Sequence, residues 1–186
     1  MDSENIFYLK DAKEISKIES NPILSLLTLT NSESHNFTAE SLFKNASNTW
    51  NDNEYIKLKN WLAYKGLPLN NTFIADASGL SRKNKITTKL VVLFLDKMRY
   101  SNDFKTYQST LSIMGVRGTL AKRNVNSELS GKFIGKTGTL SNVFALSGYL
   151  YKNEKPIIIS IIQNSNNIDQ EKGFKLLRDV YYLKSC

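Results

Sequence analysis

Gly131-Lys132-Phe133-Ile134-Gly135-Lys136-Thr137-Gly138-Thr139-Leu140 is the stretch that decides the fold, and it predicts a β-strand that ends in a candidate active site. Lys136, Thr137, Gly138 and Thr139 place an ammonium, a hydroxyl, a bare backbone position and a second hydroxyl in succession. A carboxylate lying against such a strand could be held by the ammonium and both hydroxyls. Gly138 has no Cβ, so another backbone could approach closely there.

A Lys-Thr-Gly triplet is short and occurs by chance in many proteins, so its surroundings have to support it. Residues 143–150 are apolar enough to form the paired strand, and residues 156–162 are a nearly continuous β-branched run. Such a run is typical of a central, buried strand. Residues 171–183 predict a closing amphipathic helix. Its expected inward positions are Phe174, Leu177, Val180 and Tyr181.

The first two thirds of the chain are dominated by helical patterns. Leucines and isoleucines follow Pro22, which suits the first turn of a helix. The helices are expected at about residues 23–29, 37–46, 55–64, 87–99 and 103–112. In the third of them we expect Tyr55, Ile56, Leu58, Trp61 and Leu62 to face inward. Short strands are expected at residues 6–9 and 72–75, a turn at residues 50–53, and exposed polar chain at residues 121–130.

The predicted elements are helices, then three consecutive strands, then a helix. This order predicts the α+β class, with a mixed arrangement in which helices flank one antiparallel sheet. The strands are expected at residues 132–138, 143–151 and 156–163, joined by hairpin-length connections. The 186 residues are enough for a single domain with a proper core, and we assign residues 1–186 to one domain.

Composition excludes several classes of function. The formal charge is +8, but the lysines are scattered, with no run of five or more and no basic motif interleaved with aromatic residues. We therefore expect a solvated basic surface and no nucleic-acid partner. Cys186 is the only cysteine and His35 the only histidine, which excludes an internal disulfide, a cysteine nucleophile and a histidine metal cluster. No cofactor and no metal are expected.

Two other features concern the membrane. No stretch approaches 18 apolar residues, so we expect no membrane span. Residues 1–10 carry acidic side chains and do not follow the pattern of a signal peptide.

Ser34-His35-Asn36 stands where the second helix is expected to begin. Serine and asparagine often cap helices there, because their oxygens accept hydrogen bonds from free N–H groups. That explanation for Ser34 and Asn36 has to be weighed against a role in a site. Further along, residues 76–84, Asp-Ala-Ser-Gly-Leu-Ser-Arg-Lys-Asn, form a polar loop.

Three stretches together resemble one family, namely Ser34-His35-Asn36, the loop at residues 76–84 and Lys136-Thr137-Gly138-Thr139-Leu140. It is the penicillin-binding protein 4 type of D-alanyl-D-alanine carboxypeptidase and endopeptidase, serine peptidases of the penicillin-recognising, β-lactamase/transpeptidase-like fold. Such enzymes carry Ser-x-x-Lys, Ser-x-Asn and Lys-Thr-Gly in order. The loop resembles the family's Asp-Gly-Ser-Gly-Leu-Ser-Arg, with Ala77 in place of the first glycine. The likeness also reaches residues 115–119 and the tail.

The chain departs from this family at the nucleophile. The serine of Ser-x-x-Lys should precede Ser34, and nothing there fits. The only literal match, Ser41-Leu42-Phe43-Lys44, follows Ser34 inside a predicted helix, and we interpret it as coincidental. The chain therefore resembles the C-terminal half of the enzyme, without the nucleophile-bearing part and without an export signal. A fragment, a split gene product and a degenerate copy all remain open.

The resemblance implies roles for six residues. Ser34 and Lys136 would complete a proton path to the leaving amine, and Asn36 would orient the substrate amide. Thr137 and Thr139 would bind the terminal carboxylate beside Lys136. Gly138 belongs to the same substrate-binding set, and the backbone N–H of Thr139 would supply half of an oxyanion hole.

The partner implied is a peptidoglycan stem peptide ending in D-Ala-D-Ala. β-Lactams would bind if the nucleophile half were supplied, which makes an N-terminal half chain a further expected partner. The family works in the periplasm or otherwise outside the cytoplasm. Two other functions stay open for the chain, namely a non-catalytic module that binds D-Ala-D-Ala stems and a structural or interaction protein whose motifs are relics.

Overall fold

The computed structural model describes residues 16–47, 54–123 and 127–183. Its elements are α1 (Ile23–Ser32), α2 (Asn36–Ser47), α3 (Glu54–Tyr64), α4 (Thr88–Arg99), α5 (Phe104–Ser109), β1 (Ser112–Ile113), η2 (Gly118–Leu120), β2 (Phe133–Leu140), β3 (Val143–Tyr151), β4 (Pro156–Asn164) and α6 (Gln170–Tyr182). The strand predicted at residues 6–9, the turn at residues 50–53 and Cys186 lie outside the described residues. The five predicted helices before the sheet and the closing helix are confirmed.

One antiparallel sheet organises the described part of the chain, with strand order β1-β2-β3-β4. The three predicted strands and their antiparallel pairing are confirmed, as is the α+β class. β1, which pairs Ser112 with Gly135 and Ile113 with Ile134, was not predicted from the sequence. The helix predicted to run to Ser112 ends at Ser109, because the chain turns there and its next residues join the sheet.

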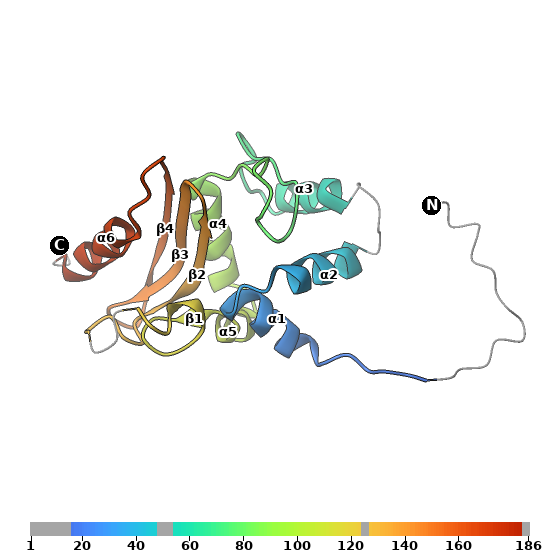
Figure 1. Ribbon diagram of the computed structural model, residues 1–186, viewed down its shortest axis with the longest axis horizontal. Helices are drawn as coiled ribbons and strands as arrows, with labels where there is room; N and C mark the ends of the chain where they lie inside the picture. Colours follow the sequence, from blue (N-terminus) through green and yellow to red (C-terminus); the bar gives the residue numbers. More distant parts are fainter. Residues whose placement is uncertain (1–15, 48–53, 124–126, 184–186) are drawn as a thin grey trace, which may run out of the picture.

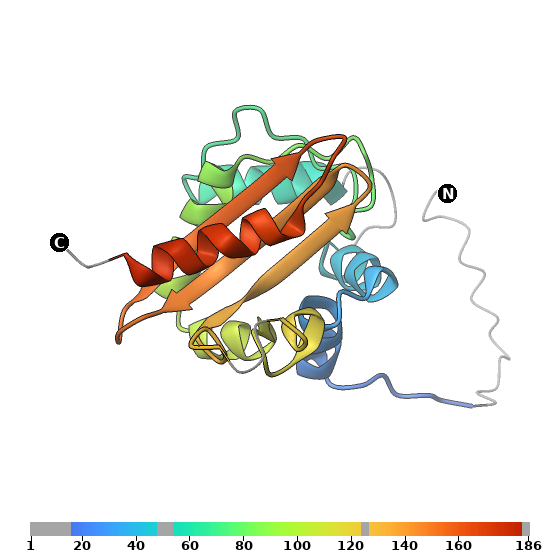
Figure 2. The ribbon, with the colours of Figure 1, turned by 60° about the vertical axis from the view of Figure 1, so that its left-hand side comes forward.

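Helices cover both faces of the sheet (Figures 1 and 2). α6 lies across one face and α4 packs on the other, against β4 and β3. On the α6 side, Phe174 and Leu177 are buried among Phe133 and Phe144. A Cβ on Gly173 would stand 2.5 Å from Cε1 of Phe144, so the glycine lets α6 approach β3 closely.

The position of β4 corrects one prediction. Its isoleucine run was interpreted as a central strand, but β4 is the last strand of the described sheet. The run is apolar on both faces because Ile159 and Ile161 join the core beside α6, whereas Ile158 packs in the cluster on the α4 side. Coverage of both faces, rather than pairing at both edges, therefore explains the composition.

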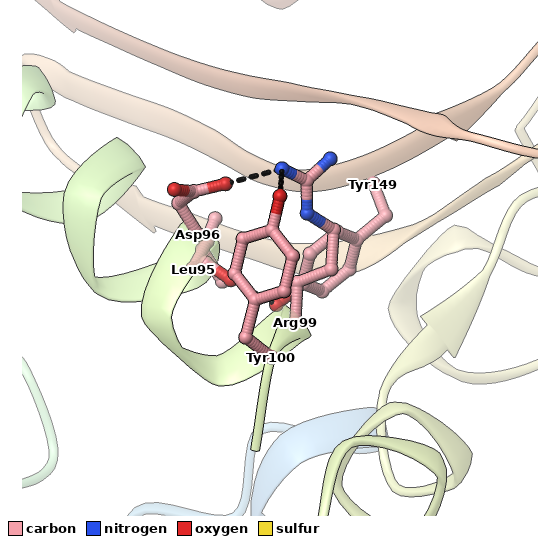
Figure 3. A network of polar contacts seen from close by, with 5 residues as sticks. All are labelled: Leu95, Asp96, Arg99, Tyr100 and Tyr149. Atoms are coloured by element: carbon pink, nitrogen blue, oxygen red, sulfur yellow. Dashed lines mark hydrogen bonds and ion pairs between the residues drawn. The ribbon is translucent and has the colours of Figure 1, made fainter.

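A buried tyrosine anchors α4 to the sheet (Figure 3). Tyr149 of β3 donates a hydrogen bond of 2.8 Å from its hydroxyl to the carbonyl oxygen of Leu95 in α4. Beside it, Arg99 donates to the Asp96 carboxylate over 2.6 Å and to the Tyr100 hydroxyl over 2.9 Å. Burial raises the pKa of Tyr149 above its ordinary value, so the phenol remains a donor across the physiological range.

Helices α1 to α3 lie beside the sheet and are less buried than their sequences suggested (Figure 1). Leu62 of α3 is buried, but Ile56 and Trp61 are 56% and 45% exposed, so the prediction that both face inward is wrong. Ile23, Leu24 and Leu29 of α1 are also exposed. Apolar spacing marks a helix, but whether a neighbour covers its apolar face depends on tertiary packing.

Two further predictions need correction, and one finding concerns membranes. Residues 72–75 contribute a single bridge between Phe73 and Lys85 rather than a strand. Leu129, in the stretch expected to be exposed, is 1% exposed and belongs to the main core. None of the described helices is long and apolar enough to cross a membrane.

Candidate active site

Lys136 and Ser34 meet at the side of β2. Lys136 Nζ donates a hydrogen bond of 2.6 Å to Ser34 Oγ and one of 2.9 Å to the carbonyl oxygen of Thr137. β1 pairs with β2 only at Gly135 and Ile134, so beyond Gly135 the outer edge of β2 has no strand partner among the described residues. Ser34 therefore stands beside a strand edge that a ligand backbone could use.

Ser34 lies in the connection between α1 and α2 and has a positive φ of 61°. Left-handed backbone is uncommon for a residue other than glycine. The helix cap is His35, whose Nδ1 accepts from the backbone N–H of Thr38 over 3.3 Å. The capping explanation for Ser34 and Asn36 is therefore wrong, and the Ser34 hydroxyl contacts Lys136 instead.

Asn36 begins α2, and its side chain is exposed. It stands two residues after Ser34, but the residues that line the nearby cleft do not include it. The predicted proximity of Ser34 and Lys136 is confirmed by the hydrogen bond between their side chains. That Asn36 joins them in one site stays a prediction.

A cleft of about 290 Å³ opens next to Ser34, on the face of β2 that carries Thr137 and Thr139. Both threonines line it, as alternate residues of a strand do on one face. None of the other lining residues was predicted as a site residue; they are Thr119, Arg123, Phe144, Gln170 and Phe174, of which Phe174 was expected only as an inward position of the closing helix. They come from η2 and the turn after it, from β3 and from α6, and of these segments only β3 was predicted from the sequence to pair with β2.

Hydroxyl groups connect the floor of the cleft to α1. Thr137 Oγ1 donates to Thr119 Oγ1 over 2.8 Å, and Thr119 Oγ1 lies 3.1 Å from Ser112 Oγ. Ser112 Oγ in turn donates to the carbonyl oxygen of Ser32 over 2.8 Å. A Cβ on Gly118 would collide with Ser32 and Ser112, so this glycine is what lets the η2 turn come so close. The chain of bonds fixes Thr137 in place.

The loop at residues 76–84 is held by one carboxylate of its own. Asp76 accepts from the backbone N–H of Gly79 over 2.7 Å and of Ser81 over 2.5 Å. Its Oδ1 also accepts from Asn84 Nδ2 over 2.8 Å. Hydrogen bonds to a charged acceptor are the stronger kind, so the loop conformation is fixed locally.

A second carboxylate joins that loop to α2. Glu40 Oε1 accepts from the backbone N–H groups of Ala77 and Ser78, each over 2.8 Å. At the other end of the loop, Arg82 donates over 2.6 Å to the carbonyl oxygen of Ser141, just after β2. The loop thus links α2 to the end of the strand that carries Lys136.

Arg123 lines the same cleft and is held by the start of α6. It donates over 2.8 Å to Gln170 Oε1 and over 3.0 Å to Glu171 Oε1. Its guanidinium carbon lies 4.8 Å from the centre of the Phe174 ring. Arg123 was not predicted as a site residue, because it lies in a polar stretch with no motif of its own.

Burial lowers the pKa of Lys136 from its ordinary value of 10.5. Removing an ammonium from water disfavours its charged form, and the hydrogen bonds that Lys136 makes within the described chain go to a hydroxyl and a carbonyl oxygen rather than to a carboxylate. A lysine of this kind can hold an anion when protonated, and it gives up its proton more readily than a solvated lysine, so its neutral form is available as a base.

With this geometry established, comparison with known proteins identifies relatives. The model of the D-Ala-D-Ala carboxypeptidase 3 (S13) family matches residues 6–179. D-alanyl-D-alanine carboxypeptidase DacB of Haemophilus influenzae is 29% identical over 174 residues, which is 88% of this chain and 36% of DacB. The D-alanyl-D-alanine carboxypeptidase of Actinomadura sp. strain R39 is 30% identical over 169 residues, 85% of this chain and 31% of the relative.

A solved structure of a relative has a similar fold. Penicillin binding protein 4 of Haemophilus influenzae, in complex with a β-lactam, superposes with a TM-score of 0.74 at 25% identity, over 86% of this chain and 42% of that one. The chain spans 36% and 31% of the length of the two curated relatives. The resemblance predicted from three short motifs is confirmed, and the chain belongs to the D-Ala-D-Ala carboxypeptidase 3 (S13) family.

Proposed function

We propose that this chain forms the substrate-recognising part of a serine-type D-Ala-D-Ala carboxypeptidase that trims peptidoglycan stem peptides. The observation that supports this most strongly is the 2.6 Å hydrogen bond from Lys136 Nζ to Ser34 Oγ at the unpaired edge of β2, in a chain of this family. Two curated relatives carry the carboxypeptidase name.

Recognition of the substrate uses the face of β2 that opens into the cleft. The hydroxyl of Thr139 donates to the terminal carboxylate, and that of Thr137 does so once its single O–H turns away from Thr119 Oγ1, to which it donates in this structure. The ammonium of Lys136 adds electrostatic attraction from beside the strand. Gly138 belongs to the same recognition strand, and a Cβ there would point away from the two threonines and touch only Ala145 Cβ, at an ordinary 3.6 Å. The carboxyl-terminal D-Ala is thereby selected over an internal residue, which has no free carboxylate.

The chemistry requires an attacking serine and a path for its proton. The serine oxygen bonds to the carbonyl carbon between the two D-alanines, the C–N bond breaks, and water later hydrolyses the resulting ester. Ser34 and Lys136 deliver the proton to the leaving amine, and Asn36 orients the substrate amide. The backbone N–H of Thr139 donates to the oxyanion, a contribution of about 3 kcal/mol in other serine hydrolases.

We place the attacking serine in a polypeptide segment outside these 186 residues. The only Ser-x-x-Lys in the sequence is Ser41 to Lys44, and it lies within α2. We therefore assign residues 1–186 to part of one peptidase domain that is completed by a nucleophile-bearing N-terminal half. β-Lactams, one of which is bound in the Haemophilus influenzae relative, would acylate the completed enzyme. Its place of action is outside the cytoplasm, where stem peptides are found.

A second candidate function is a non-catalytic module that binds D-Ala-D-Ala stems. The observation that favours it is that Ser34, the serine that lines the cleft among the described residues, is hydrogen-bonded to Lys136 and is not followed by a lysine one helical turn later. The two functions share the recognition step and differ only in whether a completed assembly cleaves the peptide.

Binding of diacetyl-L-Lys-D-Ala-D-Ala to the chain, followed by NMR, tests the shared step. We expect shifts in the cleft residues, weaker binding of the L-Ala-L-Ala isomer, and loss of binding in T137V/T139V. S41A is the matched control, since Ser41 lies in α2 away from the cleft lining. Equal binding of both isomers, or full binding by T137V/T139V, would contradict the proposal. Mixing with a nucleophile-bearing half then separates enzyme from binding module by release of D-Ala.

A further inference from the structure

We infer that Arg123 is a further specificity-determining residue, which recognises the terminal carboxylate of the ligand as the charged group of the cleft wall. This inference rests on the proposed function, because it concerns the same cleft and the same class of ligand. Among the described residues that line the cleft, Arg123 is the only charged one; the others carry hydroxyls, an amide or aromatic rings. Lys136 is not among the lining residues and already donates to Ser34 and Thr137.

The guanidinium is oriented before any ligand arrives. Gln170 and Glu171 accept hydrogen bonds from its two terminal nitrogens, and the group lies over the Phe174 ring at 4.8 Å. Gln170 and Phe174 line the cleft as well. Stacking and hydrogen bonding on two sides restrict the long side chain, so less conformational entropy remains to be lost when an anion binds.

Arg123 also keeps donors available. A guanidinium has five N–H groups in a planar fork that suits a carboxylate. The two hydrogen bonds described for Arg123 occupy two of them. A carboxylate held by the hydroxyls of Thr137 and Thr139 could accept further hydrogen bonds from this fork.

The ion pair with Glu171 is weak enough to yield to a ligand. The Arg123 side chain is 39% exposed and that of Glu171 is 65% exposed. Exposed pairs of this kind contribute little, because water screens the charges. A ligand carboxylate inside the cleft would meet the same guanidinium with less water around it. Glu171 thus acts as a competing anion that lowers affinity for the ligand.

Comparison of an acid with its amide tests the inference directly. The probes are diacetyl-L-Lys-D-Ala-D-Ala with a free carboxylate and the same peptide with a carboxamide, titrated into the chain. We expect wild type to prefer the acid, and R123A to lose about tenfold in acid affinity with little change for the amide. R123K should recover part of the loss, because it restores the charge but not the fork. K122A, which removes a neighbouring charge outside the cleft lining, should behave as wild type.

R123A could fail to fold, because Arg123 also connects its own segment to α6. The variant E171Q then provides an independent test. Neutralising Glu171 should raise acid affinity about twofold or more and leave amide affinity unchanged. An unchanged acid-to-amide ratio in E171Q, or in folded R123A, overturns the role of Arg123 while the proposed function stands. Wild type that binds neither peptide overturns the proposed function and this inference together.

Discussion

Lys136 Nζ lies 2.6 Å from Ser34 Oγ, although the two residues are 102 positions apart in the sequence. The lysine comes from the centre of β2, and the serine comes from a left-handed turn between α1 and α2. The contact brings an ammonium with a lowered pKa to a hydroxyl beside an unpaired strand edge. Four predictions depend on this arrangement or on the glycines around it, and a fifth concerns the serine nucleophile.

Replacing Lys136 with methionine should separate binding from folding. K136M keeps the length of the side chain and removes the ammonium, so stability should change by no more than about 1.5 kcal/mol. Affinity for the D-Ala-D-Ala acid should fall about tenfold or more, the equivalent of one charged hydrogen bond. Urea denaturation and peptide titration check the two parts. K132M, at an exposed lysine that precedes β2, is the control, and a fully binding K136M would contradict the role of the ammonium.

Affinity for the acid should also fall at high pH. Burial lowers the pKa of Lys136, so its charge is lost below the ordinary 10.5, and the carboxylate loses that attraction as pH rises through the lowered pKa. The stability of the fold should change with pH in the opposite direction. Burying the ammonium costs free energy below the lowered pKa, so this group makes the fold more stable as pH rises from there toward 10.5. Peptide titrations at several pH values check this prediction. K136M should show neither the loss of affinity nor the gain in stability as the pH rises.

Ser34 should carry backbone strain that a glycine relieves. Its φ is 61°, a region that costs a residue with a Cβ roughly 1 kcal/mol more than glycine. S34G should therefore be more stable than S34A by about that amount, although both lose the hydroxyl that contacts Lys136. Chemical denaturation of the pair checks this. Equal stability, or a more stable S34A, would show that the turn is not strained.

Two glycines in the sheet should respond differently to alanine. A Cβ on Gly148 would collide with the backbone of Ile134 and stand 2.5 Å from the Cα of Gly135, so G148A should destabilise by several kcal/mol or prevent folding. A Cβ on Gly138 meets only Ala145 Cβ, at 3.6 Å. G138A should fold with an unchanged melting temperature, because the added methyl lies in ordinary contact with Ala145, on the face of β2 opposite to Thr137 and Thr139. A destabilised G138A would assign this glycine to folding.

The chain by itself should not be acylated by penicillin. Ser34 is hydrogen-bonded to Lys136, but no lysine follows it by one helical turn, and residue 37 is phenylalanine. Loss of the nucleophile in a comparable hydrolase costs about 10⁶-fold in rate. Mass spectrometry of the purified chain after incubation with penicillin checks this. A stoichiometric adduct on Ser34 or Ser41 would show that the chain attacks substrates unaided.

The sequence alone determined the three long strands of the sheet, including the strand that carries Lys136, Thr137 and Thr139. Residues 133–164 follow local rules: β-branched and aromatic runs favour strands, and short polar connections favour antiparallel neighbours. The loop at residues 76–84 was recognisable because its sequence resembles a segment of the family, whereas its contacts with Glu40 and Ser141 became visible only in the structure. Thr137 and Thr139 are likewise placed on one face by a local rule, because side chains two residues apart in a strand point the same way.

Tertiary structure alone decided which distant residues meet these threonines. Arg123 and Phe174 meet at the cleft because α6 folds back on the sheet and its first turn accepts hydrogen bonds from Arg123, and no periodicity in the sequence encodes that approach. Ser34 points to Lys136 only because His35 takes over the helix cap and leaves the serine in a left-handed turn. Local propensity limits each segment to a few conformations, whereas the packing of side chains between segments selects one of them, and that choice is what assembles the site.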